Sequence, residues 1–148
     1  MGLNWTVFAI QRLGDYETRK VAAGNLIKQI KELEDKEVSI RVPATDGVSV
    51  QGGNENKQEY LLINNIATRE ELQRNLDIVQ SEIEITENGL ASLTQEEKKI
   101  LTMFYMNRSK GYVDRLCNDL YISKTELYRQ KEEALKKFTL SCYGIVEI

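Results

Sequence analysis

Histidine is absent from the 148-residue sequence, which also has a single proline, a single tryptophan and only two cysteines. Histidine is the commonest general base and metal ligand, so its absence counts against an enzyme or a metal site, although carboxylates, lysines and tyrosines remain. Cys117 and Cys142 have neither the spacing of a zinc site nor the number of a disulfide framework, which suits a reducing cytoplasm. We therefore expect no catalytic residues, no metal ion, no cofactor and no enzymatic activity.

Long apolar runs are lacking as well. A membrane-spanning helix needs roughly 18 or more consecutive apolar residues, and the sequence contains no such run. The N-terminal residues also lack the basic and apolar regions of a secretory signal. We expect a cytoplasmic protein with no membrane partner.

Positive charge is scarce overall and unevenly distributed. The net charge is −3, yet residues 94–148 carry 10 basic and 8 acidic side chains, a net of +2. Within residues 108–137 the numbers are 8 and 5, a net of +3. The local field steers a protein toward phosphate more than its total charge does. This distribution permits DNA binding without requiring it.

Helical periodicity is clearest in the first two thirds of the chain. Residues 15–36 place Ala23, Ile27, Ile30 and Leu33 close to one face of a predicted helix. A second helix is predicted for residues 58–90, with apolar positions that step by four and three residues, as in a coiled-coil seam. These positions include Leu72, Leu76, Val79, Ile83 and Leu90.

A seam this narrow on a helix this long requires a partner. Either the first helix folds back as an antiparallel hairpin, or a second copy of the chain supplies the other side, with a dimer as the favoured oligomer. The candidate oligomerisation residues are Leu72, Leu76, Val79, Ile83 and Leu90. Residues 37–57 contain Pro43 and three glycines, so we expect a flexible link there.

Two helix-start signals lie in the last third. Thr94 and Ser123 are each followed three residues later by a glutamate, the pattern of a capping box. They predict one helix at 95–106 and another that begins after Ser123, with a short apolar stripe after Gly111 between them. So short a turn before the last helix requires the last two helices to cross steeply.

The expected fold is therefore all-α. A long N-terminal helical hairpin or coiled coil, residues 1–92, precedes a trihelical helix-turn-helix unit, residues 93–148. In such units the N-terminal end of the last helix enters the major groove of DNA.

The last predicted helix carries side chains suited to that task. Lysine and arginine match guanine acceptors, and threonine can bond a base or touch a thymine methyl group. The candidate DNA-binding residues of this helix are Ser123, Lys124, Thr125, Glu126, Tyr128, Arg129 and Lys131. Arg108, Lys110 and Arg115 could add backbone contacts. Two alternatives stay open: Glu126 could only close its capping box, and Tyr128 could pack against the first helix of the unit.

Residues 93–138 resemble the fourth region of bacterial sigma factors. The shared features are a Leu-Thr-x-x-Glu opening, an apolar pair before an aromatic-rich helix end, an Ile-Ser turn, and an Ala-Leu pair three residues before an apolar position, here Phe138. With two charged helices and a Gly/Asn-rich link before it, the whole arrangement resembles the late-gene activators of RinA and ArpU type in phages and prophages of Gram-positive bacteria.

The resemblance implies a sequence-specific DNA-binding transcription regulator in the cytoplasm of a bacterial host cell. Its partners would be double-stranded DNA and, in an activator, RNA polymerase. Carried over by position, the base readers would be Lys124, Thr125, Tyr128 and Arg129, with Glu126 as a further candidate.

Two departures from the sigma pattern limit this transfer. Tyr121 stands where glycine is usual, which costs energy if the backbone there needs a positive φ. Glu132 and Glu133 would weaken phosphate contacts if they faced the duplex. A phage assembly or DNA-packaging subunit and a protein-binding module are the alternative functions.

Overall fold

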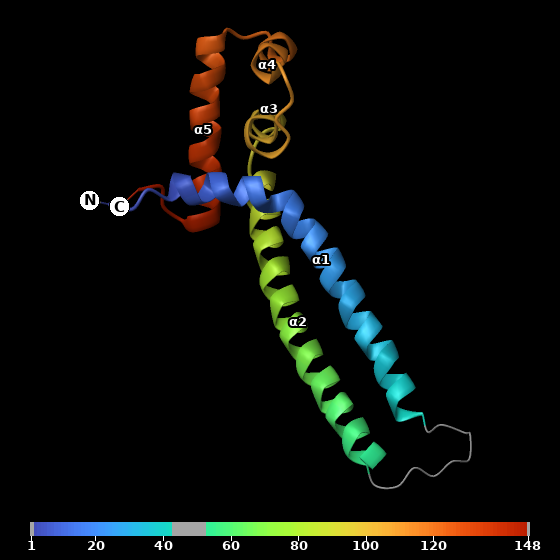
Figure 1. Ribbon diagram of the computed structural model, residues 1–148. Coiled ribbons are helices and arrows are strands. Elements are labelled where there is room, and N and C mark those ends of the chain that lie inside the picture. The colour runs from blue at the N-terminus through green and yellow to red at the C-terminus, as the bar shows by residue number, and fades with distance from the viewer. Residues whose placement is uncertain (1, 43–52, 148) are drawn as a thin grey trace. The chain divides into compact units, whose positions relative to one another are not determined.

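The computed structural model describes residues 2–42 and 53–147 (Figure 1). The regular structure in these ranges is helical, with one isolated antiparallel bridge between Asn4 and Glu147. The all-α fold predicted from the sequence is confirmed. None of these helices combines the length and apolar content that crossing a bilayer requires.

The two long helices extend further than their periodicity indicated. Helix α1 spans Trp5–Arg41 and helix α2 spans Gly53–Ala91. The flexible link predicted at 37–57 is therefore wrong at both ends, and its central residues, 43–52, lie outside the described residues. In the last turns of α1, Glu37 forms ion pairs with Arg41 and Arg69.

The chain divides into two compact units, and each long helix contributes residues to both of them. Residues 21–80 form one unit, and residues 1–20 form the other together with 81–148. These units differ from the regions expected, 1–92 and 93–148, because the ends of α1 and α2 pack with the C-terminal helices. Ala9 and Leu13 of α1 and Leu90 of α2 share a buried cluster with Phe138.

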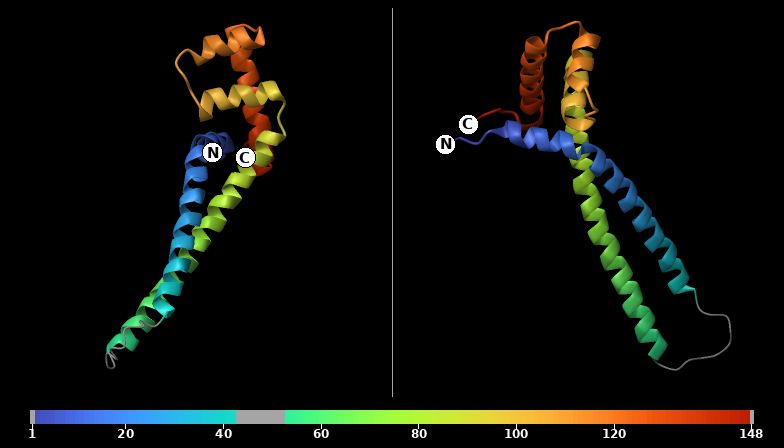
Figure 2. Two further views of the ribbon diagram at one scale, coloured as in Figure 1. Left: turned by 90° about the vertical axis from the view of Figure 1, so that its right-hand side faces the viewer. Right: turned by 45° about the horizontal axis from the view of Figure 1, so that its top comes forward.

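The unit of residues 21–80 is an antiparallel helical hairpin, and Figures 1 and 2 show its two helices side by side. Asn65 is buried in it and donates from Nδ2 to the Leu33 carbonyl at 2.9 Å. Arg69 donates to Asn65 Oδ1 at 2.9 Å and to Glu37 at 2.8 Å. Such a polar layer in an apolar seam fixes the register of the two helices.

The seam of α1 differs from the predicted one by a single position. Ile27 was placed on the packed face, but its side chain is 52% exposed, and Leu26 is half-buried instead. Together with Ile30 and Leu33, Leu26 continues the alternating steps of four and three residues that lead to Glu37.

The other unit contains helices α3, Gln95–Leu101, α4, Tyr112–Leu120, and α5, Lys124–Tyr143. A π-helical turn, η1, spans Thr102–Met106, so the helix predicted at 95–106 is interrupted. The capping box at Thr94 is confirmed: its hydroxyl accepts from the Glu97 amide at 3.2 Å, and the Glu97 carboxylate accepts from the Thr94 amide at 3.1 Å.

Gly89 lies inside α2, which continues to Ala91. A Cβ atom at Gly89 would lie 2.7 Å from a ring carbon of Phe138 and 2.9 Å from the Cys142 sulfur. The glycine therefore serves the close approach of α5 to α2.

The N-terminal end of α1 is held by the last residue of α5 and by the residues that follow it. The Trp5 amide donates to the Val146 carbonyl at 2.8 Å, and the Trp5 and Tyr143 ring centroids are 5.1 Å apart. The Asn4 side chain accepts from the Thr6 amide at 2.9 Å, which caps the first turn.

Candidate nucleic-acid interface

The connection between α4 and α5 consists of residues 121–123. Tyr121 has φ 55° and ψ 43°, and its side chain is 94% exposed. The backbone at this position does have the positive φ that would make tyrosine costly there. Because the side chain is exposed, it makes no packing contacts that would offset this steric cost. Ser123 then caps α5, because its Oγ accepts from the Glu126 amide at 3.1 Å.

The turn makes α4 run across α5 instead of antiparallel to it, as Figure 2 shows. This steep crossing was expected from the length of the connection. Leu127 on the inner face of α5 packs with Ile100, Phe104 and Leu116 in a buried cluster. The opposite face of the first turns of α5 is consequently left to solvent.

The predicted DNA-binding residues of α5 divide into two groups. Ser123, Lys124, Thr125, Tyr128 and Arg129 are exposed, and they follow one another along the N-terminal end of the helix. Glu126 is half-buried. Tyr128 also packs against the segment predicted as the first helix of the unit, 95–106, because its ring meets that of Phe104 at 5.8 Å, edge to face.

Lys131 departs from its predicted role. Its side chain is only 16% exposed, and its Nζ lies 3.0 Å from Glu132 and 5.4 Å from the centre of the Phe104 ring. Burial alone would lower the pKa of Lys131, but the contacts with Glu132 and Tyr105 outweigh it and raise that pKa. The ammonium group is thus engaged in packing, which the charge pattern alone could not reveal.

The three basic residues before and within α4 are exposed. The Arg108 guanidinium lies 4.9 Å from the centre of the Tyr112 ring, which contacts the Phe104 ring at 5.1 Å. Since Phe104 also contacts Tyr128, these rings form a continuous path between Arg108 and the first turns of α5. Lys110 and Arg115 do not share this path, and the Arg115 guanidinium donates a long hydrogen bond to the Ser109 hydroxyl, at 3.4 Å.

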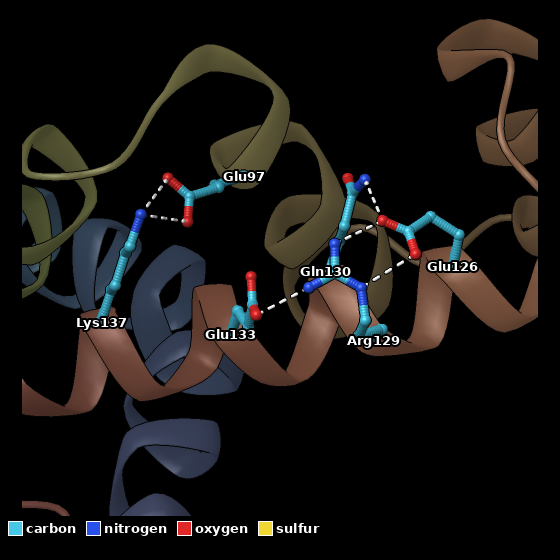
Figure 3. Close-up of polar contacts among 6 residues, drawn as sticks. All are labelled: Glu97, Glu126, Arg129, Gln130, Glu133 and Lys137. Atoms are coloured by element: carbon cyan, nitrogen blue, oxygen red, sulfur yellow. Dashed lines mark hydrogen bonds and ion pairs between the residues drawn. The ribbon is translucent and has the colours of Figure 1, made fainter.

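Arg129 is held between two carboxylates of its own helix, as Figure 3 shows. Its Nε donates to Glu126 at 2.8 Å and its Nη2 donates to the other oxygen of that carboxylate. Its Nη1 donates to Glu133 at 2.7 Å. The hydrogen bonds from Arg129 and Gln130 lower the pKa of Glu126 to about 2, and pairing with Glu126 and Glu133 raises the pKa of Arg129.

The Glu126 carboxylate therefore does not close a capping box, so that alternative, left open by the sequence, is wrong. Ser123 accepts from the Glu126 amide, but the reciprocal bond is replaced by the contacts with Arg129 and Gln130. An arginine three residues further along the helix competes successfully for the carboxylate, because a bidentate charged pair is stronger than one bond to a backbone amide.

Two ion pairs connect α3 with its neighbours. Lys137 of α5 lies 3.0 Å from Glu97, and Lys99 lies 3.0 Å from Asp119 of α4. An open groove of about 580 Å³ lies between these helices, beside Tyr121 and Arg129. The four charged side chains of these two ion pairs are paired with one another, so they stabilise the packing of the helices around the groove.

The candidate oligomerisation residues lie inside the chain's own packing. Leu76 and Leu90 are buried, and Leu72, Val79 and Ile83 are half-buried. Of the two partners that the seam left open, α1 of the same chain is the one found in the hairpin. These five side chains consequently do not form an exposed surface in this structure.

A buried arginine was missed by the sequence reasoning. The side chain of Arg12 is 10% exposed, pairs with Glu82 at 2.5 Å and donates from Nε to the Tyr143 hydroxyl at 3.0 Å. Burial alone would lower the pKa of Arg12, but the contacts with Tyr143 and Glu82 outweigh it and raise that pKa. The available signal was a basic residue between apolar neighbours, Ala9 and Leu13.

Metal binding has no evident site in the described part of the chain, where no three cysteine, aspartate or glutamate side chains are grouped closely enough to hold an ion.

Comparison with known proteins gives a family for the chain. The model of the family described as "Protein of unknown function (DUF1492)" matches residues 38–139, from the end of α1 to the last turns of α5. No curated protein and no solved structure matches the chain. Since the matched segment is more than half of the sequence, the chain belongs to the DUF1492 family.

Proposed function

We propose that the protein is a sequence-specific DNA-binding transcription regulator that works in the cytoplasm of a bacterial host cell. The observation that carries the proposal is the N-terminal end of α5. After a three-residue turn it presents Lys124, Thr125 and Arg129 to solvent, while Leu127 holds the opposite face in the core. A helix supported in this way fits the major groove, where its first turns reach base edges.

The chemistry of these side chains suits base reading. Lys124 and Arg129 can donate to the O6 and N7 atoms of guanine, and Thr125 can bond a base or contact a thymine methyl group. The amides at the start of α5 and the positive end of its dipole favour a phosphate beside Ser123. Arg108, which the ring contacts connect to Tyr128, can extend the phosphate contacts.

The sequence resemblance to sigma region four and to phage late-gene activators supports a more specific role. We propose an activator of phage or prophage genes that contacts RNA polymerase as well as DNA. One such three-helix unit buries little DNA surface and binds weakly, so two copies or a second protein are needed. Apolar side chains that are more than half exposed on the hairpin, among them Val21, Val38, Tyr60 and Ile63, favour such an association.

Selection from fragmented genomic DNA with the purified protein tests the proposal. We expect one enriched motif for the wild type, and its loss in the double variant Lys124→Ala/Arg129→Ala. A matched control, Lys28→Ala/Arg74→Ala, removes the same two charges from the hairpin and should keep the motif. Absence of enrichment with folded wild type would reject DNA reading and would favour a protein-binding or packaging role.

A further inference from the structure

We propose that Glu126 and Glu133 are specificity-determining residues of this interface: they hold the Arg129 guanidinium against α5 and so withhold its charge from the phosphates of non-specific DNA. The inference rests on the proposed function and adds how the reading helix rejects DNA that lacks its site. It concerns two acidic side chains that a DNA-binding surface would otherwise be expected to avoid.

The contact geometry supports this role. The Nε and Nη2 atoms of Arg129 donate to the two oxygens of the Glu126 carboxylate, and its Nη1 atom donates to the Glu133 carboxylate (Figure 3). Gln130 donates to Glu126 at 3.1 Å and steadies that carboxylate. The arginine, Glu126 and Glu133 all remain partly exposed, so DNA docked on this end of α5 would meet the three of them together.

The charges along this segment give the consequence. Residues 124–133 contain three basic and three acidic side chains, so their net charge is zero. In the described structure Arg129 and Lys131 have ion-pair partners, whereas Lys124 has none. An arginine already neutralised releases few counterions when it meets a phosphate, so it adds little to non-specific affinity.

A base edge offers what a phosphate does not. Phosphate repels both carboxylates, but the amino group of cytosine can donate to a glutamate while guanine accepts from an arginine. Glu126 and Glu133 therefore weaken binding to DNA that places no cytosine amino group beside them. Discrimination of this kind comes from an unfavourable interaction with the wrong partner as much as from a favourable one with the right partner.

A charge-matched comparison tests the inference. The variant Glu126→Gln/Glu133→Gln frees Arg129, and the control Glu96→Gln/Asp114→Asn removes two exposed acids of the same unit that have no ion-pair partner in the described structure. Binding of a random-sequence duplex and of the selected site would be measured from 50 to 200 mM salt. We expect the first variant alone to steepen the salt dependence on random DNA by about 0.9 per additional phosphate, about a 3.5-fold larger loss of affinity across that range.

The same substitutions in an Arg129→Gln background complete the test, since the effect must vanish when there is no arginine to free. Circular dichroism and thermal unfolding verify that each variant is folded. If the wild type selects a motif but the two acid-removal variants respond alike, or the effect persists without Arg129, this inference alone is overturned. If folded wild type does not bind DNA, the proposed function fails and the inference fails with it.

Discussion

The Lys137 ammonium lies 3.0 Å from the Glu97 carboxylate and joins α5 to the first turn of α3 across 40 residues of sequence. The same carboxylate accepts from the Thr94 amide, so one side chain closes a helix cap and braces two helices. This dual role makes Glu97 a sensitive point for the stability of the three-helix unit.

We expect Glu97→Gln to lower the free energy of unfolding at pH 7 by about 0.5 kcal/mol, because glutamine keeps the capping oxygen but loses the charge that pairs with Lys137. Burial alone would raise the pKa of Glu97, but the bonds from Thr94 and Lys137 outweigh it and lower that pKa. A carboxyl group whose pKa is lower in the folded state than in the unfolded state stabilises the fold at every pH above its unfolded-state pKa. This stabilisation is lost as the pH falls through the folded-state pKa. Urea unfolding from pH 7 to pH 3 should therefore show the difference from wild type shrinking. Glu96→Gln, an exposed neighbour, is the control, and a difference that stays constant down to pH 3 would contradict the assignment.

Gly89→Ala should destabilise the protein by about 1 to 3 kcal/mol, because the added methyl group meets Phe138 and Cys142 within 3 Å. The matched control is Gly24→Ala, also inside a helix but with no neighbour within 4 Å of the new atom. There the better helix propensity of alanine should stabilise by about 0.5 to 1 kcal/mol. Chemical denaturation of both variants checks the prediction, which requires the two changes to have opposite signs.

Tyr121→Gly should stabilise the protein by about 0.5 to 1 kcal/mol. A left-handed residue with a Cβ atom costs roughly 1 to 2 kcal/mol, part of which is offset by the greater freedom of glycine in the unfolded chain. Tyr121→Ala retains the Cβ atom and should give no such gain. Thermal unfolding compares the two variants, and equal midpoints would mean that the turn is not strained.

Lys124→Ala and Lys131→Ala should have different effects, although both remove one positive charge from α5. Lys124 is exposed, so its loss should reduce the salt dependence of DNA binding by about 0.9 and leave stability unchanged. Lys131 packs against Phe104 and Tyr128, so its loss should cost about 1 kcal/mol of stability and leave the salt dependence nearly unaltered. Salt titrations and denaturation of each variant measure the two quantities, and a reversed pattern would refute this division of roles.

Local signals in the sequence were sufficient for much of the fold. The Thr94 cap depends on four consecutive residues, and the steps of four and three along α2 depend on one helix alone. The cap could be predicted because its partners lie within one helical turn, and the seam because its spacing repeats along a single helix. The condition on Tyr121 could be stated for the same reason, since it concerns one backbone angle.

Interactions between distant residues were out of reach. Arg12 contacts Tyr143 across 131 residues, and no periodicity within α1 indicates that partner. The pairing of Arg129 with Glu126 was missed for a different reason. A capping bond and an ion pair are both available to Glu126 within one helical turn, and only their relative strengths decide which of them forms. At the candidate interface, position in the helix gave the exposed side chains, but whether each charge is free depended on its neighbours in space.

The π turn at Thr102–Met106 has a consequence for evolution. A single residue inserted into an α-helix produces such a turn, and removing one residue would rotate everything after it by about 100° around the helix axis. Phe104 and Met106, which now pack in different clusters, would then be displaced from both. Homologous chains with the same core should therefore keep the same number of residues between Leu101 and Asn107, and gaps in their alignments should fall elsewhere.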